Sequence, residues 1–172
     1  MSEKPRSSLA QSLFSHTQIR HLMRVEFGRA QRYGYGLACL QIAVDRIDHL
    51  RDLYGYDAKE AILGDVVRLL QDNTRGCDYL GRSTDDRLMA VLPHTDEAGS
   101  RSAAQRLLEA ARRIDFQAEG RRVQVSLSIG ASDFTDENTL FFDALVDSSS
   151  AALAAAVEAG GDRFEYRSPG AV

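Results

Sequence analysis

The sequence contains no tryptophan, three prolines and two cysteines among its 172 residues. Cys39 and Cys77 lie in apolar, strand-like stretches without CxxC spacing, so we expect reduced core thiols rather than disulfides or a zinc site. No apolar run reaches the length of about 18 residues that a membrane-spanning helix needs. The four histidines show no metal-binding spacing, and His94 is expected at the surface without a ligand role.

Lysine is almost absent: Lys4 and Lys59 are the only two among 21 basic residues, and the net charge is -4. This balance does not indicate a basic surface for nucleic acid. The arginine excess suits phosphates, carboxylates and guanine edges, but it can equally reflect an Ala- and Arg-rich composition. With 44% hydrophobic and 27% charged residues, the composition is that of a globular protein. We predict a disordered lead over residues 1–9 and one domain over residues 10–172.

Hydrophobic periodicity predicts alternating helices and strands along this domain. A helix over 10–33 should end at Gly34, and the helix after Gly55 should begin with a capping box from Asp57 to Glu60. Thr95 or Asp96 should cap a later helix. The expected strands are 37–44, 77–82, 88–92, 123–129 and 163–166, and the other expected helices are 45–54, the segment after 95, and 139–158. This order favours helices covering one face of a mostly antiparallel sheet.

Five segments together resemble one family. They read RAQRYGYGL (29–37), LACLQIAVDRIDHLRDLYGYDAKEAIL (37–63), RGCDYLGRSTDDRLMAVLP (75–93), VQVSLSIGAS (123–132) and AGGDRF (159–164). In this order they are similar to GGDEF, or diguanylate cyclase-like, domains, over about residues 19–166. The resemblance implies an α/β fold of the α+β type, with a ferredoxin-like sheet related to nucleotidyl cyclase and polymerase palms and flanked by helices. It also implies that Tyr35 packs in the core.

Active members of that family join two GTP molecules into cyclic di-GMP, which requires metal-binding carboxylates and a Gly-Gly turn open to phosphate. Thr84 and Asp85 stand where the glycines belong, and a β-branched threonine resists positive φ. Asp86 keeps the metal-binding acid of the signature, Arg87 replaces the next carboxylate with a cation, and Leu88 completes the segment. The signature is therefore degenerate, although Asp85 and Asp86 can also be plain turn formers.

The resemblance places further functional positions elsewhere in the chain. Ala43 replaces a second metal-binding carboxylate, Arg51 a guanine-reading Asn, and Val157 a phosphate-binding Lys; Glu60 replaces an Asp and Ala154 a Tyr. Asp45 can be a remnant of the metal site, or more simply the N-cap of a helix. From these losses we expect no catalytic residue, no metal, no required cofactor and no enzyme activity.

One ligand motif of the family remains intact. An RxxD sequence binds cyclic di-GMP in many relatives, and here Arg75 and Asp78 occupy it, with five residues between Asp78 and Thr84. The resemblance adds an arginine from the following helix, for which Arg106 is the first choice and Arg101 the second. An aspartate can accept the guanine N–H groups, and arginine can reach O6 and N7. The alternatives are a surface ion pair of small energy or an inherited remnant.

Three functions follow from these observations. The first is a catalytically inactive receptor for cyclic di-GMP that signals to a protein partner or to a second copy. The second is a protein-interaction or scaffold module that does not depend on nucleotide. The third and weakest is a residual GTP-binding pseudoenzyme. The resemblance also implies a bacterial, cytoplasmic location.

Overall fold

Five strands form the central sheet in the computed structural model, which describes residues 13–134 and 141–169. Their spatial order is β2 (Tyr79–Arg82), β3 (Leu88–Pro93), β1 (Leu37–Val44), β6 (Leu127–Phe134) and β7 (Arg163–Tyr166). β1 pairs antiparallel with β3 and β6, and β2 pairs antiparallel with β3. β7 runs parallel to β6 at the edge. The predicted mostly antiparallel sheet flanked by helices is confirmed.

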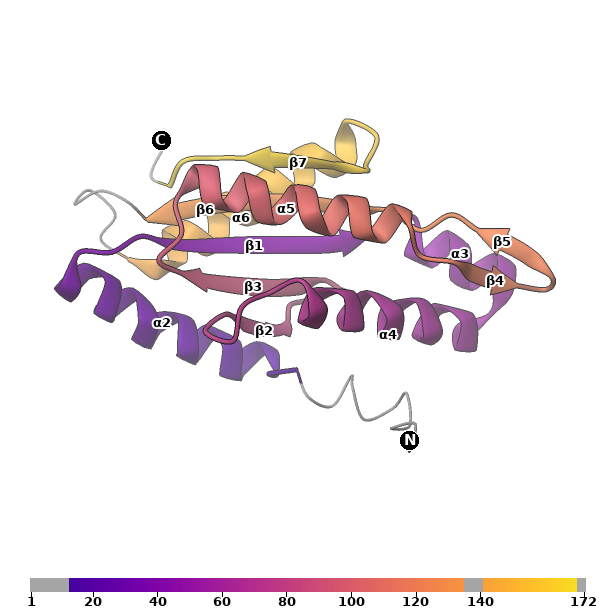
Figure 1. The fold of residues 1–172 in the computed structure, drawn as a ribbon, viewed down its shortest axis with the longest axis horizontal. Coiled ribbons are helices and arrows are strands. Elements are labelled where there is room, and N and C mark those ends of the chain that lie inside the picture. Colours follow the sequence, from indigo (N-terminus) through magenta and orange to yellow (C-terminus); the bar gives the residue numbers. More distant parts are fainter. Residues whose placement is uncertain (1–12, 135–140, 170–172) are drawn as a thin grey trace.

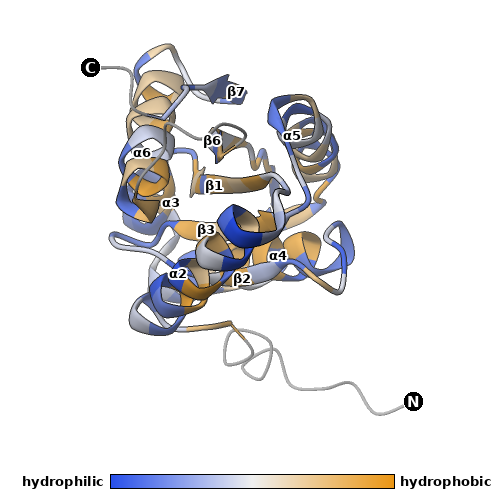
Figure 2. Cartoon of the chain, turned by 90° about the vertical axis from the view of Figure 1, so that its left-hand side faces the viewer, coloured by the Kyte–Doolittle hydropathy of each residue, from blue (hydrophilic) through white to orange (hydrophobic). Residues whose placement is uncertain are grey.

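Helices cover both faces of this sheet, as Figures 1 and 2 show. The helices are α2 (His16–Tyr33), α3 (Ile47–Tyr54), α4 (Tyr56–Asp72), α5 (Glu97–Arg112) and α6 (Phe142–Glu158). α2 and α6 lie on one face and α4 and α5 on the other. The expectation of helices on one face only is therefore wrong.

The reason lies in β1, which is apolar on both sides. Leu40 and Ile42 point into the core under α4 and α5, whereas Leu37 and Cys39 point into the core under α2 and α6. Successive side chains of a strand point to opposite faces, so a continuous apolar run requires cover on both.

The helix ends follow the capping chemistry of the sequence in most cases. Ser15 and Gln18 form a capping box at the start of α2, which ends at Gly34 with φ 73°. Asp96 caps α5 by accepting a hydrogen bond from Gly99 N, as predicted. The predicted capping box at Asp57 is absent, because the N-cap of α4 is Gly55, two residues earlier, and it has no side-chain cap.

A small hairpin interrupts the predicted strand 123–129. β4 (Phe116–Ala118) pairs with β5 (Arg121–Val123) in a separate two-stranded sheet, and β6 begins only at Leu127. Val123, Val125 and Leu127 are all buried in one core. The alternation of apolar residues therefore continues from a hairpin arm into the next strand.

The two cysteines differ in environment. Cys39 is buried in β1, whereas Cys77 is exposed in the turn before β2, so the prediction of two core thiols is wrong for Cys77. No helix within residues 13–134 and 141–169 is both long and apolar enough to cross a bilayer. The predicted lead, 1–9, lies outside the described residues.

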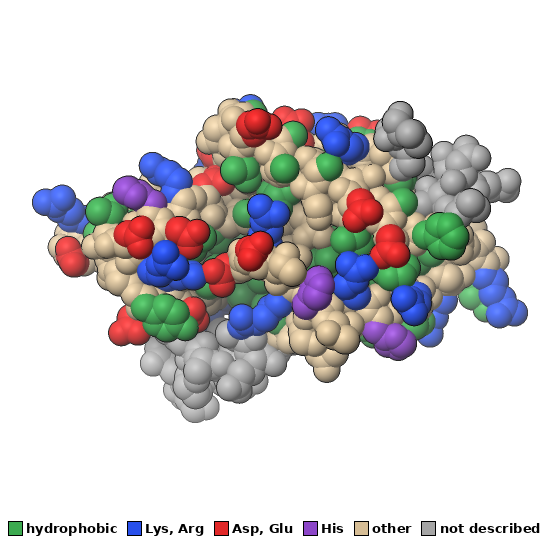
Figure 3. Space-filling model, turned by 180° about the vertical axis from the view of Figure 1, so that it is seen from behind, with side chains coloured by type: hydrophobic (Ala, Val, Ile, Leu, Met, Phe, Trp, Pro, Cys, Tyr) green, Lys and Arg blue, Asp and Glu red, His purple; other side chains and the backbone are tan. Residues whose placement is uncertain are grey.

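Acidic and basic side chains alternate over the face seen in Figure 3. Neither sign gathers into a continuous patch on the part of this face that the structure describes.

Candidate functional site

An open cavity of about 830 Å³ lies between the end of α2, the turn before β2, the turn after β3, and α5. Arg75, Asp78 and Arg106 all line it. The structure therefore brings together three residues that the sequence motif and the family resemblance selected from two separate segments.

Arg75 and Asp78 form a close ion pair within this cavity. Asp78 Oδ1 lies 3.0 Å from Arg75 Nη2, and Oδ2 accepts the backbone N–H of Arg75 at 2.8 Å. The Asp78 side chain is 4% exposed and that of Arg75 is 49% exposed. Hydrogen bonding to Asp78 raises the pKa of the Arg75 guanidinium. The carboxylate thus holds the arginine, rather than standing free to read a base.

The same guanidinium ties two turns together. Arg75 Nη2 lies 2.7 Å from the carbonyl oxygen of Pro93 and 2.8 Å from Thr95 Oγ1. Both acceptors flank the turn between β3 and α5. The hydrogen bonds of Arg75 to described residues are made by its backbone N–H, Nε and Nη2.

The two candidate arginines of α5 are separated by the structure. Arg106 lines the cavity of Arg75 and, within the described part of the chain, makes no ion pair. Arg101 lies 3.4 Å from Glu97, covers the ring of Phe164 at 5.1 Å, and lines a different hollow beside β7. Arg106 is therefore the arginine that can share a ligand with Arg75.

The signature segment forms a tight turn between β2 and β3. Arg87 N donates to Thr84 O at 3.1 Å, and Ser83 N donates to Arg87 O at 2.8 Å. The positive φ values fall on Asp85 (57°) and Asp86 (60°), not on Thr84. The expected conflict at Thr84 does not arise, because two aspartates adopt the left-handed conformation that a two-residue hairpin requires. Leu88 begins β3 and is buried.

Asp86 is engaged by Lys59, a residue that the sequence reasoning missed. Lys59 Nζ lies 2.6 Å from Asp86 Oδ2, and the lysine side chain is 8% exposed. The hydrogen bond to Asp86 raises the pKa of Lys59. A useful signal was present, since Lys59 is one of only two lysines in an arginine-rich chain.

The carboxylate of this turn that the resemblance assigns to a metal is already paired. Among the described residues, no three His, Cys, Asp or Glu side chains lie together as a metal-binding group. Asp86 is paired with a cation, and Ala43 has no ligand atom. Arg51, which the resemblance aligns with a guanine-reading residue, pairs with Asp48 and Asp52 at 3.5 and 3.4 Å. Val157 is 48% exposed on α6.

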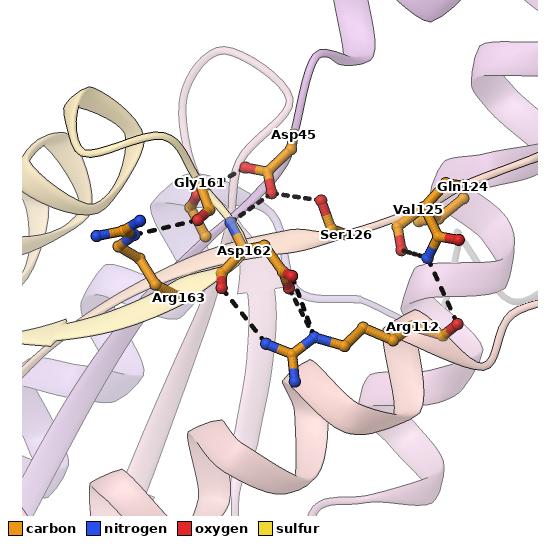
Figure 4. Close-up of polar contacts among 9 residues, drawn as sticks. Asp45, Arg112, Gln124, Val125, Ser126, Gly161, Asp162 and Arg163 are labelled. Carbon is orange, nitrogen blue, oxygen red and sulfur yellow. Dashed lines mark hydrogen bonds and ion pairs between the residues drawn. The ribbon is translucent and has the colours of Figure 1, made fainter.

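Asp45 has a role other than the two expected for it. Arg46, not Asp45, is the N-cap residue of α3. The Asp45 carboxylate accepts hydrogen bonds from Ser126 and Ser128 Oγ, both at 2.6 Å, and from Asp162 N at 2.8 Å (Figure 4). Asp45 thus fastens the end of β1 to the turn between α6 and β7.

Comparison with known proteins places these features in a family. The family model described as "Diguanylate cyclase, GGDEF domain" matches residues 11–163. Diguanylate cyclase DosC of Escherichia coli is 29% identical over 145 residues, covering 84% of this chain and 31% of that protein. Diguanylate cyclase DgcP of Pseudomonas aeruginosa is 26% identical over 140 residues, covering 81% of this chain and 21% of that protein. This chain thus spans about a third or less of the length of these curated relatives.

Solved structures agree with the fold. The active GGEEF domain of a diguanylate cyclase from Vibrio cholerae superposes with a TM-score of 0.84 at 21% identity, covering 90% of this chain and 97% of that one. The GGDEF domain of FimX from Pseudomonas aeruginosa gives 0.84 at 21% identity, covering 97% and 99%.

These findings correct the expectation that the chain is not an enzyme. The relatives that match most of its length are named diguanylate cyclases, and an active domain shares its fold. The differences noted at Ala43, Thr84, Asp85 and Arg87 rest on the resemblance, and the comparisons show no loss of activity. The chain belongs to the GGDEF domain family.

Proposed function

We propose that this domain binds cyclic di-GMP in the cavity lined by Arg75, Asp78 and Arg106, and acts as a receptor for that nucleotide. The observation that carries the proposal is that two arginines from distant segments line one open cavity of about 830 Å³. Guanidinium groups recognise phosphates and the O6 and N7 atoms of guanine, and they stack on purine rings.

In this proposal the two arginines contact the ligand from different walls of the cavity. Arg75 is held by the buried carboxylate of Asp78, and its half-exposed side chain lines the cavity. Arg106 contacts the ligand from α5, on another wall of the cavity. A pre-positioned guanidinium loses less side-chain entropy on binding, so the ion pair supports affinity even though Asp78 itself stays turned to Arg75.

A relative supports the choice of ligand. The GGDEF domain of DgcB from Caulobacter crescentus was solved in complex with c-di-GMP, and it superposes with a TM-score of 0.83 at 11% identity, covering 90% of this chain. The bound nucleotide is a property of that protein. We extend it to this chain because the cavity here offers the donors that such a ligand needs.

Isothermal titration of nucleotide-free protein with cyclic di-GMP tests the proposal. We expect micromolar or tighter binding, and Arg106→Ala should weaken it about 10- to 100-fold, as for a lost hydrogen bond to a charged group. The matched control is Arg101→Ala, which removes the same charge from the same helix but outside the cavity.

The Arg75→Ala, Asp78→Ala double variant should abolish binding. Its melting temperature must be recorded as well, because Arg75 also holds the turn after β3. Absence of heat with the unmodified protein would overturn the proposal and leave a nucleotide-independent protein-interaction module as the next candidate. Equal weakening by Arg101→Ala and Arg106→Ala would also overturn it, since a general loss of charge would then explain both.

A further inference from the structure

Two aromatic side chains stack on the wall of the same cavity. The rings of Tyr35 and His94 lie 3.9 Å apart between centroids, with 25° between their planes. Tyr35 comes from the segment between α2 and β1, and His94 from the turn between β3 and α5. Both line the cavity that holds Arg75 and Arg106. Sequence reasoning assigned Tyr35 to the core and gave His94 no ligand role, so neither was expected here.

The hydroxyl group of Tyr35 is held by a hydrogen bond to a buried carboxylate. Its hydroxyl donates to Glu26 Oε1 at 2.6 Å, and Glu26, on α2, is only 5% exposed. Burial, together with this hydrogen bond, raises the pKa of Tyr35 to about 12. The hydroxyl therefore stays protonated in neutral solution, and the ring is held in one orientation.

His94 is fixed through its backbone. Its φ is 53°, a left-handed conformation that a non-glycine residue keeps only when its surroundings hold it. Arg75 supplies that hold, because Nη2 binds Pro93 O and Thr95 Oγ1 on either side of His94. Tyr35 stacks on one face of the imidazole, and His94 as a whole is exposed.

We propose that the Tyr35–His94 pair is a stacking surface for a purine base, placed beside the arginines that contact the rest of the nucleotide. This inference rests on the proposed binding of cyclic di-GMP in this cavity and adds a base-recognising surface to it. Base–aromatic stacking needs a flat ring, and a ring that is already positioned loses less entropy on binding. Tyr35 is held by its bond to Glu26 and stacks on His94. The Arg75 guanidinium, which is held by Asp78, also bonds Pro93 beside His94. The arginine that contacts the ligand is therefore coupled to the turn that carries the stacked ring.

Three variants separate stacking from other roles of these residues. His94→Asn removes the ring but suits the turn, since asparagine tolerates positive φ. It should weaken binding of cyclic di-GMP about 5- to 100-fold, the usual loss when a stacked aromatic residue is removed. His94→Phe keeps a flat ring and should bind nearly as well as the unmodified protein. Tyr35→Phe keeps the ring but loses the bond to Glu26, and should weaken binding less than His94→Asn.

Calorimetric titration of these variants beside Arg106→Ala distinguishes the possible failures. If the unmodified protein does not bind, the proposed function itself fails. If it binds and Arg106→Ala weakens binding while His94→Asn does not, the nucleotide is bound here but the stacking surface is refuted. Equal losses in His94→Phe and His94→Asn would also refute stacking, because a polar contact from the imidazole would then explain both. A purine fluorophore, such as a 2-aminopurine analogue of the ligand, should be quenched by the unmodified protein and not by His94→Asn.

Discussion

Gly161 packs so closely against the carboxylate of Asp45 that the turn between α6 and β7 has no room for a side chain at this position. A Cβ at Gly161 would lie 2.9 Å from the carboxylate of Asp45, and φ there is 77°. Gly161→Ala should therefore lower the free energy of unfolding by about 1–3 kcal/mol, through backbone strain and loss of the Asp45 bonds. Urea denaturation measures the change. Gly28→Ala is the control, because a Cβ in that part of α2 meets nothing within 4 Å, and a comparable loss there would refute the explanation.

The two thiols should react very differently in the native protein. Burial raises the pKa of Cys39 to about 11, whereas Cys77 is exposed. Because the thiolate is the reactive form, Ellman's reagent should titrate one thiol rapidly and the second only after denaturation. Cys77→Ser should remove the rapid phase. Two rapidly reacting thiols in the folded protein would contradict the burial of Cys39.

The candidate site was partly predictable from individual residues. Arg75 and Asp78 lie three positions apart, so a local motif fixed both. The choice between Arg106 and Arg101 could not be made without the packing of α5 on the sheet, because only the structure shows which arginine lines the cavity of Arg75. Lys59 stood out only as one of two lysines, and its pairing with Asp86 and the stacking of Tyr35 on His94 could not be predicted, because the partners are distant in the chain.

The contact between α6 and β6 depends on one missing side chain. A Cβ at Gly130 would lie 2.1 Å from Leu153 N and 2.4 Å from Ser149 O, both backbone atoms of α6. Backbone cannot yield as a flexible side chain can, so Gly130→Ala should displace the helix and cost about 3 kcal/mol or more. Chemical denaturation checks this, with Gly64→Ala on α4 as the control, where a Cβ meets nothing within 4 Å. An unchanged denaturation midpoint would show that α6 can shift freely.

Most elements were predictable because their periodicity is strong and their ends carry caps or glycines. The hairpin of β4 and β5 was not, since Phe116, Val123 and Val125 enter the same core as β6 and hide the break in the chain. The presence of helices on both faces of the sheet was not predicted either, although the unbroken apolar run of β1 already required it.

Across the whole molecule, the sheet separates two cores that must form together, because β1 contributes to both. A change in the protonation of a buried group on the sheet should therefore appear in global unfolding rather than in local fraying. Asp133 on β6 is such a group, being 3% exposed and bonded to the hydroxyl of Tyr166 on β7.

Burial raises the pKa of Asp133 above its ordinary value of 3.8, and the charges of Glu97 and Asp96 act in the same direction, while the Tyr166 bond opposes them. A raised native pKa means that the folded state holds the proton more tightly than the unfolded chain does. Asp133 thus contributes stability that is complete below the unfolded pKa and is lost as pH rises through the native pKa.

Asp133→Asn removes this titration and keeps an acceptor for Tyr166. Relative to the unmodified protein, the variant should become more stable as the pH rises above the unfolded pKa of about 4, until Asp133 is ionised in the folded protein as well, by at most about 1.4 kcal/mol per pH unit for one proton. Urea unfolding of both proteins at a series of pH values measures the difference. Parallel curves would mean that Asp133 ionises equally easily in the folded and unfolded states, and a difference that shrinks with rising pH would reverse the sign of the assigned shift.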